Sequence, residues 1–168
     1  MGMIGHLKQV SPELLNDLIE QKVDAFSILF EESDVNRTLY LDKSWHAIHF
    51  LLNGEAWEGE EPLVYAVFGG AAIGGEPNFE EGDEVEEDSP ARYLTVEQVK
   101  QVSAALQQIP EEELARRFIP ARMAELDIYP STWEDEGELA YVMDYYRELA
   151  AYYQEAADNG QAMLLHIG

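Results

Sequence analysis

The stretch LYLDKSWHAIHFLLNG, residues Leu39–Gly54, places an acid, a tryptophan and two histidines in one segment with a helical pattern. Asp42 stands where an N-cap belongs, because its carboxylate can accept hydrogen bonds from the first turn of a helix. Asn53 followed by Gly54 is a typical helix end. Between these ends, the residues that share one helix face are Trp45, Ile48, His49 and Leu52. The segment therefore predicts a helix whose apolar face packs into the core.

His49 is unusual because it is a polar residue in this apolar stripe, and two interpretations follow. In the first, His49 is a buried structural residue with hydrogen-bonded ring nitrogens, and Asp42 is a cap. In the second, His49 is a catalytic general base or metal ligand, assisted by Asp42 or His46. The pattern favours the structural interpretation. His46 and His49 form an HxxH pair with no further ligand specified, so we expect no metal site.

Length and composition predict one globular domain over residues 1–168. The chain is 46% hydrophobic and contains nine tyrosines, six phenylalanines and three tryptophans, which argues against disorder. It contains no cysteine, which excludes disulfides and thiolate chemistry and suits a reducing cytoplasm. The sequence shows no secretory signal pattern and no apolar run of membrane-spanning length, so we expect a cytoplasmic protein.

A formal net charge of −24 is the second strong feature of the sequence. Such a surface repels phosphate backbones and anionic lipids, so neither nucleic acids nor membranes are expected partners. The acids are unevenly placed, because residues 44–91 contain twelve Asp or Glu and no Lys or Arg. Eight of these acids fall within residues 76–88, which we expect to form an exposed loop. Either this region keeps the protein soluble, as the pattern favours, or it is an acidic face that captures a basic protein or a divalent cation.

The remaining pattern predicts an α+β fold that is rich in helices. We expect strands at residues 3–10 and 161–167, so that both ends of the chain can pair in one small mixed sheet. Residues 38–41 have an extended pattern. Ser11 before Pro12 and Thr95 before an apolar periodicity are helix starts. Further helices are expected over residues 24–31, 62–68, 111–118, 120–126 and 136–158.

The glycine-rich segment FGGAAIGG, residues 68–75, follows an apolar segment and invites comparison with a phosphate-binding loop. A P-loop ends in Gly-Lys-Ser/Thr, whereas Gly75 is followed by Glu76, and no dinucleotide-binding GxGxxG is present. The neighbouring acids would also repel a phosphate. We therefore expect flexible turns in this segment and no bound cofactor.

Several short blocks, taken together, resemble the YfbM-like family of uncharacterised bacterial proteins. These blocks are Met1–Gly5, Asp42-Lys43-x-Trp45-x-x-x-His49-Phe50 ending at Gly54, Tyr93-Leu94-Thr95, Ile128-Tyr129-Pro130 leading to Trp133, and Tyr152-Tyr153 with Ala156-Ala157 and Gly160. They span nearly the whole chain in order. The resemblance implies a soluble bacterial protein with an α+β fold, and it assigns no substrate, cofactor or catalytic residue. Position 46 is variable in the family pattern, which also argues against a two-histidine metal site.

Three hypotheses about function come from different classes. The favoured one is a non-catalytic binding protein whose acidic surface captures a basic protein, in the manner of an immunity protein that blocks a cationic toxin. The second is a small hydrolase-like enzyme centred on His49, with Asp42 as the other catalytic candidate. The third is a small-molecule binding domain. Its candidate ligand-binding residues are Trp45, His46, Tyr129 and Trp133.

Overall fold

The helices and strands follow one another along nearly the whole chain in a computed structural model that describes residues 3–30, 38–74, 90–130, 133 and 137–168. The strands are β1 (Gly5–Val10), β2 (Leu39–Asp42), β3 (Arg92–Leu94) and β4 (Ala162–Ile167). The helices are α1 (Pro12–Ile19), α2 (Ala25–Leu29), α3 (Trp45–Asn53), α4 (Tyr65–Phe68), α5 (Val96–Gln107), α6 (Glu111–Arg116), α7 (Pro120–Glu125) and α8 (Glu138–Asp158). The acidic loop expected at residues 76–88 lies outside the described residues.

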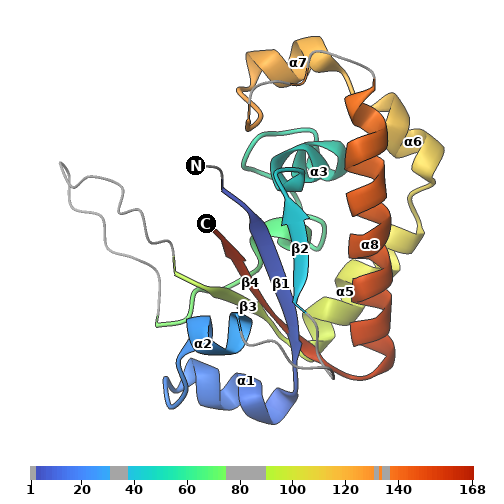
Figure 1. Cartoon of the computed structure of the whole chain (residues 1–168). Coiled ribbons are helices and arrows are strands. Elements are labelled where there is room, and N and C mark those ends of the chain that lie inside the picture. The colour runs from blue at the N-terminus through green and yellow to red at the C-terminus, as the bar shows by residue number, and fades with distance from the viewer. Residues whose placement is uncertain (1–2, 31–37, 75–89, 131–132, 134–136) are drawn as a thin grey trace, which may run out of the picture.

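The two ends of the chain meet in the sheet, whose strand order is β2-β1-β4-β3 (Figure 1). Strands β1 and β4 pair along their full length, from Gly5 opposite Ile167 to Val10 opposite Ala162. The α+β class and the pairing of the two terminal strands are confirmed. Every pairing in the sheet is antiparallel, whereas we expected a mixed sheet.

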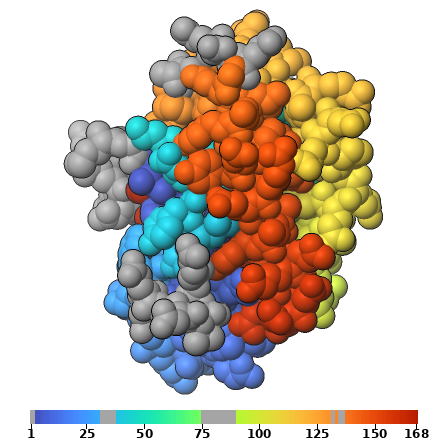
Figure 2. Space-filling model, turned by 45° about the vertical axis from the view of Figure 1, so that its right-hand side comes forward, coloured from blue at the N-terminus to red at the C-terminus, as the bar shows by residue number. Residues whose placement is uncertain are grey.

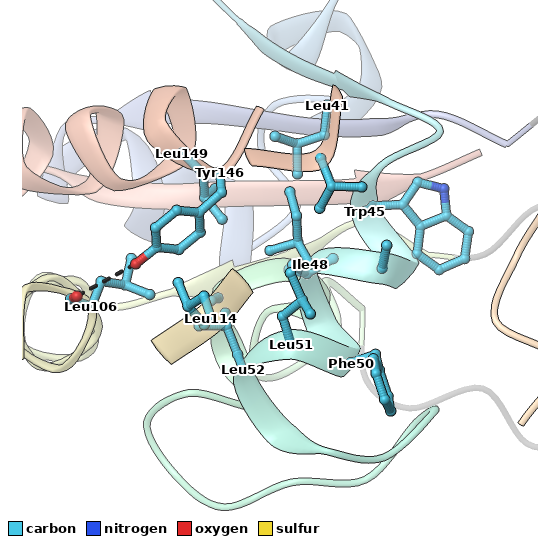
Figure 3. Packing of buried hydrophobic residues seen from close by; sticks show 14 of the residues in the cluster. Leu41, Trp45, Ile48, Phe50, Leu51, Leu52, Leu106, Leu114, Tyr146 and Leu149 are labelled. Carbon is cyan, nitrogen blue, oxygen red and sulfur yellow. Dashed lines mark hydrogen bonds between the residues drawn. The ribbon is translucent and has the colours of Figure 1, made fainter. Parts of the chain in front are cut away.

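Both faces of the sheet are covered by helices, which explains why β1 and most of β4 are buried. On one face, Leu7, Met163 and Leu165 belong to the larger core, with residues of α3, α5 and α8. On the other face, Val10 and Leu164 pack with side chains of α1 and α2. This alternation follows from the two-residue period of a strand. The larger core is shown in Figure 3, where the Tyr146 hydroxyl also donates a hydrogen bond to the carbonyl of Leu106.

The longest helix, α8, runs along the surface, and in Figure 2 it lies between β2 (cyan) and α6 (yellow). Its buried residues are Val142, Met143, Tyr146, Leu149, Tyr153 and Ala156, which recur with helical period. Among the helices that the structure describes, none combines the length and the apolar character needed to cross a membrane.

The predicted helix starts at Ser11 and Thr95 are confirmed. The Ser11 hydroxyl accepts a hydrogen bond from the Leu14 N–H at 3.1 Å. Thr95 and Gln98 form a reciprocal capping box, in which each side chain accepts from the other residue's backbone N–H.

The described part of the glycine-rich segment consists of bends and turns, as expected, and it also pairs with β3. The Gly70 N–H donates to the carbonyl of Tyr93, and the Tyr93 N–H donates to the carbonyl of Ala71. The Ile73 N–H donates to the carbonyl of Ala91 at 2.8 Å. Glycine suits this segment because Gly69 and Gly74 have positive φ, and because Gly70 lies close to the backbone of β3. Strand β3 itself was not predicted, since its three residues are too few to show a period.

We expect Gly69→Ala to destabilise the protein more than Gly160→Ala. Gly69 has φ +77° and ψ −171°, a conformation almost restricted to glycine, and an added Cβ would lie 3.0 Å from the Cβ of Arg92. Gly160 has φ +64° but open space around it, so its substitution costs only backbone strain. Urea unfolding should give a loss of about 2–3 kcal/mol for Gly69→Ala and about 1 kcal/mol for Gly160→Ala. Equal losses would contradict the close approach of the Gly69 turn to β3.

Candidate functional site

Helix α3 is buried on every side, which makes it the centre of the candidate site. All eight residues from Trp45 to Leu52 are buried, so burial extends beyond the predicted apolar face and includes His46. The helix lies against α4, α6 and α8, and the segment after Gly54 bonds back to its histidines. Gly54 ends the helix in the left-handed conformation, with φ +76°, as predicted.

Asp42 does not cap α3, which corrects the sequence prediction. The helix begins at Trp45, its N-cap position is Ser44, and Asp42 is the last residue of β2. The Asp42 carboxylate accepts a hydrogen bond from the Tyr141 hydroxyl at 2.7 Å. Burial, followed by this hydrogen bond, raises the pKa of Tyr141 above its ordinary value. Asp42 therefore ties β2 to α8, and among the described contacts none joins it to His46 or His49.

His46 links three separate segments through its two ring nitrogens. Its Nε2 lies 2.7 Å from the carbonyl oxygen of Ala56, and its Nδ1 lies 2.7 Å from the backbone nitrogen of Tyr129. Since a carbonyl can only accept and an N–H can only donate, Nε2 carries the proton and Nδ1 accepts. The ring is fully buried and contacts the indoles of Trp45 and Trp57, whose ring centroids lie 5.0 Å and 4.4 Å away.

His49 is held in a similar way one turn further along α3. Its Nε2–H donates to the carbonyl of Glu58 at 3.1 Å, and its Nδ1 accepts from the Asn53 amide at 3.3 Å. The Asn53 amide nitrogen also contacts the carbonyls of His49 and Leu63, so it joins α3 to the segment before α4. The His49 ring is fully buried and lies 4.2 Å from the ring of Phe68, centroid to centroid.

Burial keeps both imidazoles neutral at pH 7. Desolvation lowers the pKa of His49 to about 4, against the opposing effect of its hydrogen bond to the Glu58 carbonyl. Desolvation also lowers the pKa of His46. Protonation of Nδ1 in His46 would place two donors against each other at the Tyr129 N–H. A general base needs a nitrogen that reaches a substrate, so catalysis by His49 requires it to exchange an existing hydrogen bond.

The aromatic candidates for a small-molecule site lie together and pack against one another. Trp45 is 1% exposed, stacks on Tyr129 at 5.3 Å, and donates from Nε1 to the carbonyl of Met3. Trp133 is 6% exposed and donates from Nε1 to the carbonyl of Tyr129. The Tyr129 hydroxyl accepts from the N–H of Met3 at 2.8 Å. Each polar group thus has a backbone partner, which is how aromatic residues are satisfied in a core.

Trp57 is the residue that sequence reasoning missed, and it lies within the acid-rich stretch that the sequence analysis identified. Trp57 is 61% exposed, yet its ring contacts His46, Trp45 and Phe68. Residues of the same segment and of the end of α5 line a groove of about 700 Å³. The groove carries the glutamates Glu55, Glu58, Glu60 and Glu61. A single tryptophan among these acids was the available signal, but only the histidine contacts show that the segment is held in place.

The described side chains also bear on metal binding. Among residues 3–30, 38–74, 90–130, 133 and 137–168, no three His, Asp or Glu side chains lie close enough together to hold a metal ion.

An antiparallel sheet with helices on both faces defines the class as an α+β protein. The chain belongs to the family described as "Domain of unknown function (DUF1877)", whose model matches residues 1–166. It is similar to Protein YfbM of Escherichia coli (strain K12), with 26% identity over 180 residues and all of both chains covered. The crystal structure of YfbM from Escherichia coli, a protein of unknown function, shares the fold with a TM-score of 0.73. That likeness has 23% identity and covers 98% of this chain and 99% of the other. The family resemblance is therefore confirmed, and the family is one of unknown function.

Proposed function

We propose that this protein is a non-catalytic binding protein that captures a basic protein through its acidic surface. The observation that carries the proposal is the histidine arrangement of α3. His46 and His49 are neutral, fully buried and hydrogen-bonded at both ring nitrogens, and their partners include the carbonyls of Ala56 and Glu58. The pair thus acts as a support that holds an exposed acidic segment rather than as a reactive centre.

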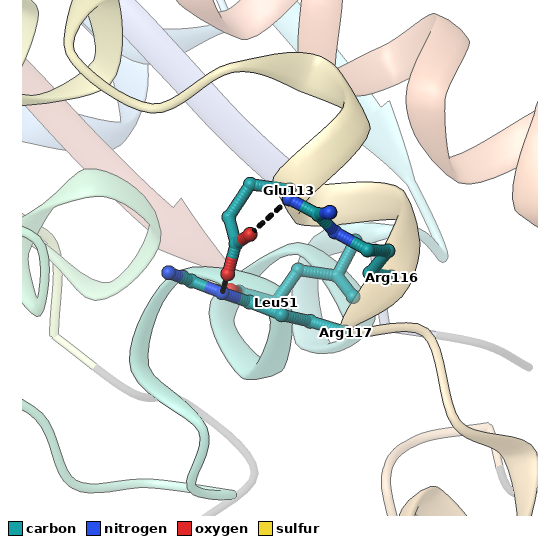
Figure 4. A network of polar contacts seen from close by, with 4 residues as sticks. All are labelled: Leu51, Glu113, Arg116 and Arg117. Carbon is teal, nitrogen blue, oxygen red and sulfur yellow. Dashed lines mark hydrogen bonds and ion pairs between the residues drawn. The ribbon is translucent and has the colours of Figure 1, made fainter.

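The ion pairs that the Lys and Arg residues form within the chain support the same function. The chain has ten Lys and Arg against 34 Asp and Glu, and several of these cations already contact acids of their own chain. In Figure 4, Arg116 and Arg117 both contact Glu113, and Arg117 also donates to the carbonyl of Leu51 in α3. The remaining excess of acid generates a field that attracts a cationic partner and accelerates its association.

The finer parts of the proposal concern context. We infer a cytoplasmic location, which the absence of cysteine supports, and one domain over residues 1–168, which the family match over residues 1–166 supports. An immunity-like role, in which the protein blocks a cationic toxin, fits the charge. The hydrolase-like and small-molecule alternatives stay predictions. Both are less favoured, because His49 and the aromatic residues are buried and would have to move to meet a ligand.

The test is salt-dependent capture of a defined partner. The purified protein, immobilised, is exposed to a lysate of its own host at low salt, and the retained proteins are identified and purified. We expect a basic partner whose dissociation constant rises about a hundredfold between about 0.05 M and about 0.5 M salt, because salt screens the attraction. A partner that is not basic, or whose affinity does not change with salt, would overturn the proposal.

A further inference from the structure

The groove beside the 55–61 segment has a lining of mixed chemistry. Its lining comes from Leu52 and Asn53 at the end of α3, from Glu55 and residues 58–63 after it, and from Ala105, Gln108 and Ile109 at the end of α5. Partly exposed apolar side chains, including Leu63 and Ile109, line it together with four exposed glutamates. Among the described residues that line the groove, none is Lys or Arg. The groove therefore offers apolar surface and negative charge together.

The glutamates of the groove carry unbalanced negative charge. Among the residues that the structure describes, Glu55, Glu58, Glu60 and Glu61 form no ion pair, in contrast to Glu113 and Glu125 elsewhere. The C-terminal end of α5 adds to the negative potential, because helix α5 has no basic residue in its last turn. The charged side chains among the described lining residues thus all have one sign, which specifies a positively charged occupant.

The groove is also shaped before any partner arrives. The carbonyls of Ala56 and Glu58 accept from the two buried histidines, and Asn53 donates to the carbonyl of Leu63. Gly59 lies so close to the Asn53 side chain that a Cβ has no space between them. A wall held at both ends loses little conformational entropy on binding, which favours affinity.

We propose that this groove is the docking site for a basic amphipathic segment of a partner protein, in which lysine or arginine residues flank apolar ones. The inference rests on the proposed binding function and adds the place and the chemistry of the contact. Apolar side chains of the segment cover Leu63 and Ile109, while its cations meet Glu55, Glu58 and Glu60. Charge complementarity and the apolar floor both select this occupant over an acidic or a purely polar one.

The test compares two triple variants with the same change in net charge. Glu55→Gln/Glu58→Gln/Glu60→Gln neutralises the groove and spares Glu61, which accepts from the Tyr65 hydroxyl. The control is Glu97→Gln/Glu148→Gln/Glu155→Gln, because these exposed acids of α5 and α8 do not line the groove. The probe is a short fluorescein-labelled peptide of lysine and leucine, measured by fluorescence anisotropy at low salt. A lysine and serine peptide of equal charge tests the apolar floor.

The long-range field is the same in both triples, so any difference between them reports the local contact. We expect the groove triple to bind the lysine and leucine peptide about tenfold more weakly than the control triple, since three local charge pairs are lost. Equal weakening in both triples would overturn the groove and leave the proposed function standing. Equal affinity for the two peptides would overturn the role of the apolar floor. If wild type binds neither peptide, both the groove and the capture of basic partners are wrong.

Discussion

His46→Ala should lower the free energy of unfolding by about 3–5 kcal/mol, the largest loss that we expect from any single substitution discussed for this chain. The change removes a ring that is 0% exposed and leaves a cavity beside Trp45 and Trp57. It also leaves the carbonyl of Ala56 and the N–H of Tyr129 without their partner. The measurement is urea unfolding at pH 7, followed by circular dichroism and tryptophan fluorescence.

His46→Phe separates the cavity from the hydrogen bonds. Phenylalanine keeps an aromatic ring beside the two indoles but can neither donate to Ala56 nor accept from Tyr129. We expect a loss of about 2–3 kcal/mol for this variant, because each buried group that loses its partner costs about 1–3 kcal/mol. A loss below about 1 kcal/mol in both variants would mean that His46 is not the link between these segments.

Wild type should lose stability relative to His49→Gln as the pH falls from 7 to 4. The pKa of His49 is about 4 in the folded protein and 6.5 when unperturbed, so the unfolded chain binds a proton in this interval and the folded chain does not. The contribution of neutral His49 is fully present above pH 6.5, is lost as the pH falls towards 4, and changes no further below that value. The stability advantage of wild type over the variant should shrink by about 3 kcal/mol across the interval.

The comparison with His49→Gln removes the other titrations from this measurement. The many surface acids also take up protons below about pH 5, which relieves repulsion in the folded protein. This effect is common to wild type and variant, and glutamine has no proton to gain. Chemical unfolding at several pH values therefore isolates His49. A wild-type advantage that stays constant with pH would show that His49 titrates alike in the folded and unfolded states, and the enzyme hypothesis would regain an accessible imidazole.

Local patterns in the chain were enough to locate most of the helices and strands. Ser11 and Thr95 predicted the starts of their helices, because the side chain of a capping residue bonds to a backbone N–H only three residues further along. The strands at both ends were recognisable from short apolar runs, and their pairing in one sheet is confirmed. Strand β3 and its partner segment at Gly70 were not recognisable, because their pairing joins residues far apart in the chain and leaves no local period.

In the candidate site, too, the sequence identified residues by local pattern but could not show their distant partners. The unusual composition of residues 39–54 marked His46, His49 and Asp42 from the sequence, and burial of His49 with two bonded nitrogens is what the structural interpretation anticipated. The sequence could not show that Asp42 pairs with Tyr141 in α8 instead of capping α3. Nor could it show that His46 joins Ala56 to Tyr129.

The sequence alone determined the net charge, the family and the main helices and strands. The charge depends on composition, and the helices and strands depend largely on contacts within a few positions. The role of each polar side chain depends on which distant backbone groups reach it after the chain has packed. A buried imidazole becomes a support or a catalyst according to whether protein atoms or solvent meet its nitrogens. At His46 and His49 the ring nitrogens are hydrogen-bonded to protein atoms. Two of these bonds, to the carbonyls of Ala56 and Glu58, hold the segment beside the acidic groove.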